Sequence, residues 1–400
     1  MVLQITVHLF VMNMQKERAV TMDSVRNIKN SKISLLYLSL IFMVPFSGFY
    51  ITKLSVSPVY LSSFLGLCFF LLAILFGTKI KKNGILSLAL FFLFYIASSQ
   101  IIFDKPNMTS YLNFMLSLII FIGVYIVSAK VPTLRILRLS RFFILVSIPL
   151  LVVESYIRLR YPPIGKIEQI VSAGREDIMF YIFKFNSIMY QDSNFVAMFI
   201  LPLFFFQLYI NDYIKKRNLF ITASLAMLLL MTISRAAILA MILFYVFYLY
   251  RAKLYKMRKI ITCLLFIIVP LVYTLTAKFA FVDDSFASKF MIVNIAIDYL
   301  KSVDIVHFLF GVGIGNAVSV LNIGAHNIIV SLIVETGIIG LTFNIVLWLM
   351  ILFKTKYKAG IIMFPFSFAG LSFASLAIPF LYVMFAIVIV LESRKKQIAK

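Results

Sequence analysis

Apolar runs, each bounded by a few polar residues, follow one another along almost the whole chain. A transmembrane helix needs about 20 mostly apolar residues to cross the hydrocarbon core of a bilayer. The pattern therefore predicts an all-α integral membrane protein, a polytopic bundle of about twelve transmembrane helices. The predicted spans lie near residues 33–49, 59–76, 85–103, 111–129, 142–157, 194–210, 219–233, 236–250, 260–277, 328–353, 360–374 and 377–391.

Basic residues gather in every second connection between these predicted spans. This set of segments, which includes both ends of the chain, holds 27 of the 38 Lys and Arg residues, whereas the other side holds 11 of the 15 Asp and Glu residues. Cytoplasmic loops of membrane proteins carry such an excess of positive charge. We therefore expect both termini in the cytoplasm. The basic segments are 1–32, 77–84, 130–141, 211–218, 251–259, 354–358 and 392–400.

The predicted topology gives one polytopic domain, residues 33–391, between cytoplasmic tails 1–32 and 392–400. Two outer, periplasmic loops are long, 158–193 and 278–327, and the other connections are tight. Long loops over a rigid scaffold commonly carry binding and catalytic residues, so we expect an outer-face site there.

Two regions leave alternatives open. Residues 360–391 give little length for two spans, so short helices or a re-entrant hairpin are alternatives. Residues 2–12 are apolar but lack the preceding basic region of a signal peptide, and Met14 or Met22 is the expected start.

Composition supports the membrane interpretation. Hydrophobic residues make up 62% of the chain, charged residues 13%, and the mean hydropathy is +1.03. Soluble domains have about 45–50% apolar and about 25% charged residues. The net charge of +23 is attributed to basic cytoplasmic loops, and no nucleic-acid partner is expected. Cys68 and Cys263 lie in apolar runs, which excludes a disulfide framework.

Candidate chemistry begins with His326, which stands where the second long loop meets a predicted span. A histidine pKa near about 6.5 makes it a natural proton acceptor at neutral pH. A capping histidine at the membrane interface is the structural alternative. The preceding turn, Gly311–Asn316, includes Gly313 and Gly315 and permits close backbone approach. No βαβ context surrounds this turn, so it is not a dinucleotide fingerprint.

Outer basic residues are candidates for binding an anion. Arg235 follows Ser234 between two apolar runs, where a helix N-terminus, capped by Ser234, and a guanidinium together suit a phosphate. A snorkelling arginine is the alternative. Arg175 and Arg158 belong to the cationic first outer loop, which also holds Arg160, Lys166 and Lys184. Glu154 and Arg158 are four residues apart, so they are also expected to pair on one helix.

Three further features have a structural and a functional interpretation. Asp192, Ser193 and Asn194 are all good N-cap residues at the start of the sixth predicted span. Glu335 is an intramembrane carboxylate, a functional candidate whose partner the sequence does not name. The Gly337-x-x-Gly340 pair is expected to let another helix approach closely.

The sequence shows no D-x-D motif, no His/Cys metal cluster and no P-loop, so we expect no metal and no cofactor. Fixed cations would then have to stabilise any anionic leaving group.

The chain resembles the O-antigen polymerase/ligase family of bacterial polysaccharide assembly (Wzy type). The resemblance rests on the topology, on the glycine-rich turn, and on Ser234-Arg235 at a hairpin. It also rests on His326-Asn327, nine further residues and Gly337-x-x-Gly340, which match the H-[NSQ]-x9-G-x-x-[GTY] pattern of the family's ligases. Asp192-x-Asn194 is similar to the D-x-N of its polymerases. The similarity covers about residues 190–345.

The resemblance implies a metal-independent glycosyltransferase in the bacterial inner membrane, with its active site facing the periplasm. Its substrates would be oligosaccharides on undecaprenyl pyrophosphate, and its partners membrane lipid and a chain-length regulator protein. His326 would be the general base, and Arg235 and Arg175 would stabilise the departing pyrophosphate. The residues expected to contact substrate are Asn327, Gly313, Gly315, Asn194 and Arg158.

Polymerase is the preferred interpretation, because the D-x-N motif and compact outer loops favour it. A ligase that transfers polymer to lipid A–core is the alternative, since the histidine pattern fits it equally. A lipid-linked oligosaccharide flippase and a scaffold or sensor without chemistry are the other classes. A flippase should carry more ionisable residues near the middle of its spans than this chain does.

Overall fold

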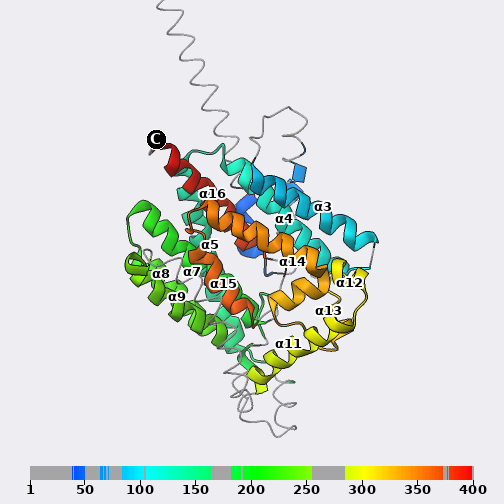
Figure 1. Cartoon of the computed structure of the whole chain (residues 1–400). Helices are drawn as coiled ribbons and strands as arrows, with labels where there is room; N and C mark the ends of the chain where they lie inside the picture. The colour runs from blue at the N-terminus through cyan, green and yellow to red at the C-terminus, as the bar shows by residue number, and fades with distance from the viewer. Residues whose placement is uncertain are drawn as a thin grey trace, which may run out of the picture.

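The computed structural model describes residues 40–49, 83–102, 105–163, 182–184, 186–190, 192–254, 284–372 and 378–398, with isolated residues between these ranges. Helices are the regular elements of these ranges, which contain no strand (Figure 1). The elements are η1 (Val44–Phe46), α3 (Gly84–Ile102), α4 (Met108–Ser128), α5 (Thr133–Arg160), α7 (Ser193–Ile214), α8 (Leu219–Met231), α9 (Arg235–Leu254), α11 (Asp284–Ser302), α12 (Ile305–Phe310), α13 (Ala317–Leu321), α14 (Ile328–Lys354), α15 (Gly360–Gly370) and α16 (Pro379–Ile398).

Five helices, α3, α4, α5, α7 and α14, are long and apolar enough to cross a membrane. Shorter apolar stretches form α8, the part Arg235–Tyr250 of α9, and α15. The all-α prediction is confirmed for the described residues, and their architecture is that of a helical membrane protein.

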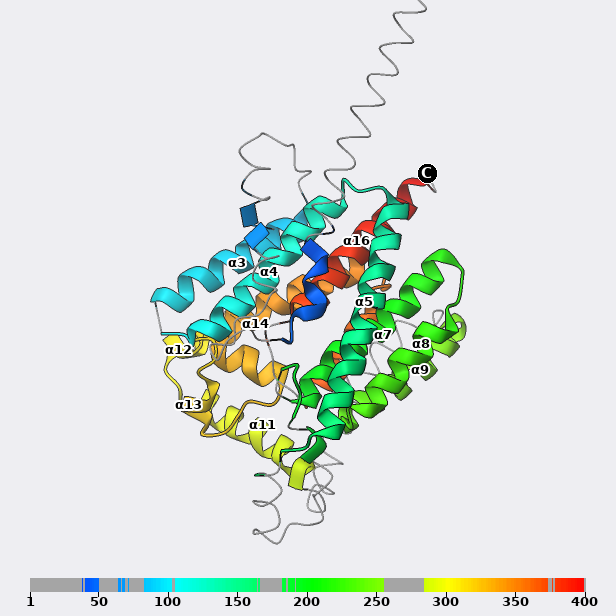
Figure 2. The same cartoon turned by 180° about the vertical axis from the view of Figure 1, so that it is seen from behind.

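Helices α7 and α16 form the centre of the bundle (Figures 1 and 2). Every residue of 196–211 and 380–391 is buried, which a helix that is apolar on all sides requires. Helix α16 packs along α4, α15 packs on α7 and α9, and α14 packs on α3. Outer helices expose large apolar side chains such as Phe94 and Phe220, as a lipid-facing surface would.

The segments predicted to be cytoplasmic meet at one end of the bundle. Arg394 of α16 donates a hydrogen bond to the hydroxyl of Thr133 at 3.0 Å and thereby joins the segments 130–141 and 392–400; it also donates to the carbonyls of Ser128 and Ala129, at 3.1 and 2.9 Å. The Tyr248 hydroxyl of α9 donates to the carboxylate of Asp212, at 2.8 Å, beside the segment 211–218. The C-terminus lies at this end, and α11 lies at the opposite end (Figures 1 and 2).

Two of the described segments are helical where the hydropathy pattern predicted a connection between spans. Helix α5 already begins at Thr133, inside the predicted basic segment 130–141. The predicted loop 278–327 folds into α11, α12 and α13 in its described part. Hydropathy measures partition into lipid, so it misses helix that continues into water.

Two predicted spans are also shorter or irregular. Helix α15 covers only Gly360–Gly370, in agreement with the short-helix alternative. Within the predicted span 33–49, the described residues contain a 3-10 turn at Val44–Phe46, with Pro45 near its start. An α-helix does not continue through Pro45 unchanged, because proline lacks the N–H that the helix would use. Residues 1–32, most of 59–76 and all of 260–277 lie outside the described residues.

Helix α14 is interrupted at Gly337, whose backbone has φ 66° and ψ −178°. Carbonyls beside the break accept hydrogen bonds from other elements. The Val334 carbonyl accepts from the N–H of Val312 at 2.9 Å, and the Thr336 carbonyl accepts from the Tyr95 hydroxyl at 2.7 Å. The buried backbone groups at the break are therefore satisfied by tertiary contacts.

The Glu335 side chain holds the glycine-rich turn on α14. Its carboxylate accepts hydrogen bonds from the backbone N–H groups of Gly315 and Ala317. On the other side of the turn, the Ile314 N–H donates to Gln100 of α3 at 2.5 Å. These contacts name the partner of Glu335 that the sequence left open, and they make the turn part of the packed framework.

Replacing Gly337 with alanine is expected to destabilise the protein by about 3 kcal/mol, because the backbone there is open only to glycine and the new methyl group has no space. A Cβ atom at Gly337 would lie 2.2 Å from the Leu309 carbonyl oxygen. The measurement is the thermal unfolding midpoint of the purified protein in detergent. Gly165→Ala is the matched control, since no atom of the described residues lies within 4 Å of a Cβ there. Equal midpoints for the two variants would contradict the prediction.

Candidate functional site

Five charged or titratable side chains gather at the end of the bundle opposite the C-terminus. Both lysines of this group interact electrostatically with its arginine and its aspartate, and its histidine interacts with one lysine and with the aspartate. The five residues come from five separate segments. We call them the basic cluster; its members are Lys184, Asp192, Arg235, Lys289 and His326. The cluster carries three fixed cations and one carboxylate, so it has an excess of positive charge that suits an anionic ligand.

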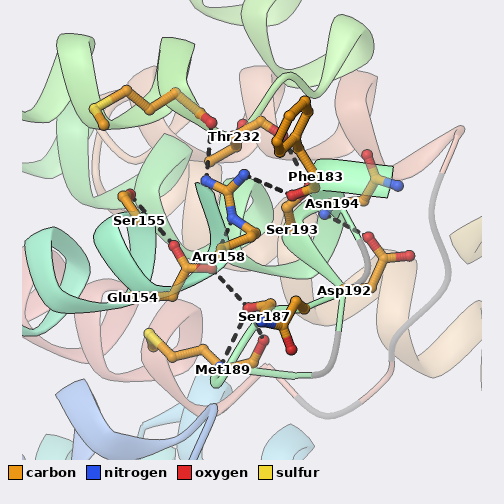
Figure 3. A network of polar contacts seen from close by, with 12 residues as sticks. Glu154, Ser155, Arg158, Phe183, Ser187, Met189, Asp192, Ser193, Asn194 and Thr232 are labelled. Atoms are coloured by element: carbon orange, nitrogen blue, oxygen red, sulfur yellow. Dashed lines mark hydrogen bonds and ion pairs between the residues drawn. The ribbon is translucent and has the colours of Figure 1, made fainter. Parts of the chain in front are cut away.

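Each member stands at or near the end of an element. Asp192 is the N-cap of α7, and its carboxylate accepts a hydrogen bond from the N–H of Asn194 at 2.7 Å (Figure 3). Arg235 is the first residue of α9, and His326 lies two residues before α14. Lys184 ends a short 3-10 turn, and Lys289 lies on α11. Helix N-termini therefore add partial positive charge beside Arg235 and His326.

The two lysines are held close to other cations. The pKa of Lys184 is lowered to about 8, chiefly by burial; Asp192 opposes this shift, and Arg235 and Lys289 add to it. Burial and Arg235 likewise lower the pKa of Lys289. Repulsion between neighbouring positive charges disfavours the protonated form of each lysine, although one carboxylate lies among them. A bound anion would relieve this repulsion.

His326 is accessible at the surface of the cluster. Partial burial of its ring and, secondly, the Lys289 ammonium lower the pKa of His326 below its usual value, although Asp192 opposes this shift. The imidazole is therefore neutral at pH 7 and able to accept a proton. Its ring lies over Gly324, where a Cβ atom would stand 2.8 Å from Nε2, so glycine provides the space that the ring occupies.

The turn before Arg235 is strained. Ile233 has φ 57°, a left-handed conformation that a β-branched residue rarely adopts. Strain of this kind costs about 1–3 kcal/mol and is concentrated at functional sites. Ser234, the expected helix cap, is fully buried, and its hydroxyl has no hydrogen-bond partner in the described part of the chain. The cap predicted for Ser234 is therefore not observed.

Several predicted substrate contacts have structural roles. Asn327 is the N-cap of α14, and its side-chain oxygen accepts from the N–H groups of Ile329 and Val330 at 2.9 and 3.3 Å. Asn194 is half-buried beside its cap residue Asp192. Helix capping thus explains the side chain of Asn327, whereas Asn194 takes part in a cap only through its backbone N–H.

Arg158 requires a correction. It was expected in the first outer loop as a substrate contact, but it lies within α5 and is fully buried (Figure 3). Its pairing with Glu154 is confirmed, with Nε 2.9 Å from the carboxylate. A fully buried guanidinium does not touch a substrate at the surface.

The remaining predicted residues lie away from the basic cluster or outside the described part. Gly313 and Gly315 belong to the turn that packs between α3, α4 and α14. Arg175 and Lys166 lie outside the described residues. His326 and Arg235 belong to the same cluster through Lys289, which interacts electrostatically with both. Asp192, singled out in the sequence as an N-cap and for its D-x-N similarity, lies in this cluster as well.

Lys289 and Gly324 were missed by sequence reasoning. Lys289 is the only charged residue between Asp284 and Asp298. An isolated cation in an apolar stretch is a functional candidate, and this pattern could have identified Lys289 from the sequence. Gly324 precedes His326 by two residues, and only the position of the ring shows its role.

The positive charge of the described site comes from side chains. Within the described residues, no three His, Cys, Asp or Glu side chains are grouped so that they could hold a metal ion. The geometry offers an imidazole that interacts with Lys289, within a cluster that holds three cations. Comparison of the chain with models of protein families and with characterised proteins gives no match.

Proposed function

We propose that the chain is a membrane glycosyltransferase of the O-antigen polymerase type. It would transfer a growing glycan from undecaprenyl pyrophosphate to the next lipid-linked repeat unit. The observation that carries this proposal is the basic cluster, in which a proton acceptor and three cations from distant parts of the chain meet at one end of an apolar bundle.

The chemistry divides between the two kinds of side chain. His326 removes the proton from the acceptor hydroxyl as its oxygen bonds to the anomeric carbon of the donor. The bond from that carbon to the pyrophosphate breaks, and undecaprenyl pyrophosphate leaves with its negative charge. Arg235, Lys184 and Lys289 stabilise that charge electrostatically. Arg175 remains a predicted further contributor.

Two lipid-anchored substrates suit this location. Their sugars would meet at the end of the bundle while their hydrocarbon chains stay in the membrane, and holding both in one orientation supplies much of the rate enhancement. The proposal includes about twelve spans, both termini in the cytoplasm and the cluster facing the periplasm of a bacterial inner membrane. The gathering of basic segments at the opposite end of the bundle supports this orientation.

The test is a gel of surface polysaccharide from a host strain that lacks the gene. A polymerase predicts lipid A–core with a single repeat unit, and the chain supplied in trans should restore the polymer ladder. Bare core with polymer on the undecaprenyl carrier would identify a ligase, which uses the same chemistry on another acceptor. Bare core with repeat units trapped on the cytoplasmic face would identify a flippase. A normal ladder in the strain without the gene would overturn the proposal.

A further inference from the structure

A buried ion pair lies among the segments that carry Lys184, Asp192 and Arg235 (Figure 3). Glu154 and Arg158, both on α5, have no exposed surface, and Arg158 Nε is 2.9 Å from the Glu154 carboxylate. The other carboxylate contacts come from serine hydroxyls, Ser187 at 2.8 Å and Ser155 at 3.3 Å. The carboxylate is therefore fully engaged inside the protein.

The two terminal nitrogens of Arg158 bind backbone carbonyls from two other segments. Nη1 donates to the Phe183 carbonyl at 2.9 Å, and Nη2 donates to the Met231 carbonyl at 2.8 Å. Phe183 directly precedes Lys184, and Met231 ends α8 just before the turn that leads to Arg235. One guanidinium thus holds the backbone of both segments that carry these cluster residues.

A third contact extends this framework to Asp192. The Ser193 hydroxyl, next in sequence to Asp192, donates to the Thr232 carbonyl at 2.9 Å. Thr232 follows Met231, whose carbonyl Arg158 binds. Three of the five members of the basic cluster are therefore attached to the Glu154–Arg158 pair through a few bonded residues.

Stability alone does not explain a pair of this kind. Removing two charges from water is so costly that buried ion pairs are often replaceable by apolar residues of similar size without loss of stability. Arginine, however, is the side chain whose planar fork donates in several fixed directions at once, which lysine cannot reproduce. The arrangement at Arg158 uses three of these directions on three different segments.

We propose that Arg158, oriented by Glu154, is the positioning residue of the basic cluster: it sets where Lys184 and Arg235 stand relative to each other by holding the carbonyls of Phe183 and Met231. The inference rests on the proposed function only for the identity of the ligand, the pyrophosphate group of a polyprenyl lipid. The arrangement itself can be tested without any ligand.

The experiment compares the wild-type protein, purified in detergent, with the double variant Glu154→Leu/Arg158→Met. Removing both partners avoids leaving one charge buried alone, so this variant is expected to unfold near the wild-type temperature. The first measurement is the pH dependence of Lys184 labelling by an amine-reactive reagent, read by mass spectrometry. The wild-type midpoint is expected near pH 8, and in the double variant it should rise by at least one pH unit because Lys184 leaves its crowded position.

The second measurement is the affinity for undecaprenyl pyrophosphate in mixed micelles, which should fall at least tenfold in the double variant. Arg394→Met is the matched control, because Arg394 also donates to two backbone carbonyls but at the opposite end of the bundle. It should leave both the Lys184 midpoint and the affinity unchanged. If the double variant does not fold, Arg158→Lys serves instead, with a smaller rise of the midpoint in the same direction.

The outcomes separate this inference from the proposed function. A double variant with the wild-type midpoint and affinity would overturn the positioning role, as would Arg158→Lys with a wild-type midpoint. A wild-type protein that does not bind the lipid pyrophosphate would count against the proposed function. In that case, a raised Lys184 midpoint in the double variant would still support the positioning role.

Discussion

Replacing His326 with alanine is expected to lower the rate of glycan transfer by about 10²–10⁴-fold, the contribution typical of a general acid–base residue. The ring is accessible and outside any helix, so the folded structure should persist. The measurement is the polysaccharide ladder of a strain carrying only the variant, together with turnover of lipid-linked repeat units by the purified protein.

The control for this variant is His307→Ala. His307 lies on α12 and is paired with the exposed carboxylate of Asp304, so its loss should leave the ladder unchanged. An intact ladder from a well-expressed His326→Ala protein would exclude His326 as the base and with it the mechanism.

The pH dependence of transfer offers a second measurement on the same residue. Because the pKa of His326 is lowered, the neutral base persists to more acidic pH than an ordinary histidine allows, and the acid limb of the rate profile should lie below pH 6.5. Lys289→Ala removes a cation that disfavours the protonated imidazole, so it should move this limb to higher pH. A limb that does not respond to Lys289→Ala would contradict the electrostatic coupling of the two residues.

Replacing Arg235 with alanine is expected to reduce the rate about 10²–10³-fold, as the loss of one group that stabilises transition-state charge commonly does. Arg235→Lys should recover part of the rate, because it keeps the charge but loses the bidentate fork. The measurement is turnover by the purified variants at saturating substrate, so that weakened binding does not hide the effect on the chemical step.

Arg160→Ala is the matched control on the same end of the bundle. Arg160 is exposed at the end of α5, over the ring of Tyr161 and apart from the basic cluster. Its variant should transfer glycan at the wild-type rate. Equal losses in Arg235→Ala and Arg160→Ala would show that only the general positive charge of this surface matters.

The predictable part of the fold is the part that local sequence controls. Uninterrupted apolar runs predicted α3, α4 and α7 to within a few residues, because membrane partition depends on composition over one segment. The break at Gly337 was not predicted. A glycine inside an apolar run looks like a packing site, and only the approach of Leu309 shows that the helix path changes there.

The residues of the candidate site were likewise predictable only in part. His326 and Arg235 stand at the ends of apolar runs, where a polar residue attracts notice, and both lie in the basic cluster. Arg158 looked equivalent to them in sequence, yet α5 extends far enough to bury it beside α8. Burial of this kind depends on which distant helix packs there, and no local pattern contains that information.

The break in α14 also gives a meaning to the interval between His326 and Gly337. The nine helical residues between Asn327 and Gly337 form a rigid rod of about 14 Å, fixed at the far end to the glycine-rich turn by Glu335. One residue more or less in this rod would turn the imidazole by about 100° around the helix axis and away from Lys289 and Asp192. Beyond Gly337 the helix follows a different path. The position of the His326 imidazole therefore depends on the length of the rod before Gly337, and not on how deep the rest of α14 lies in the membrane.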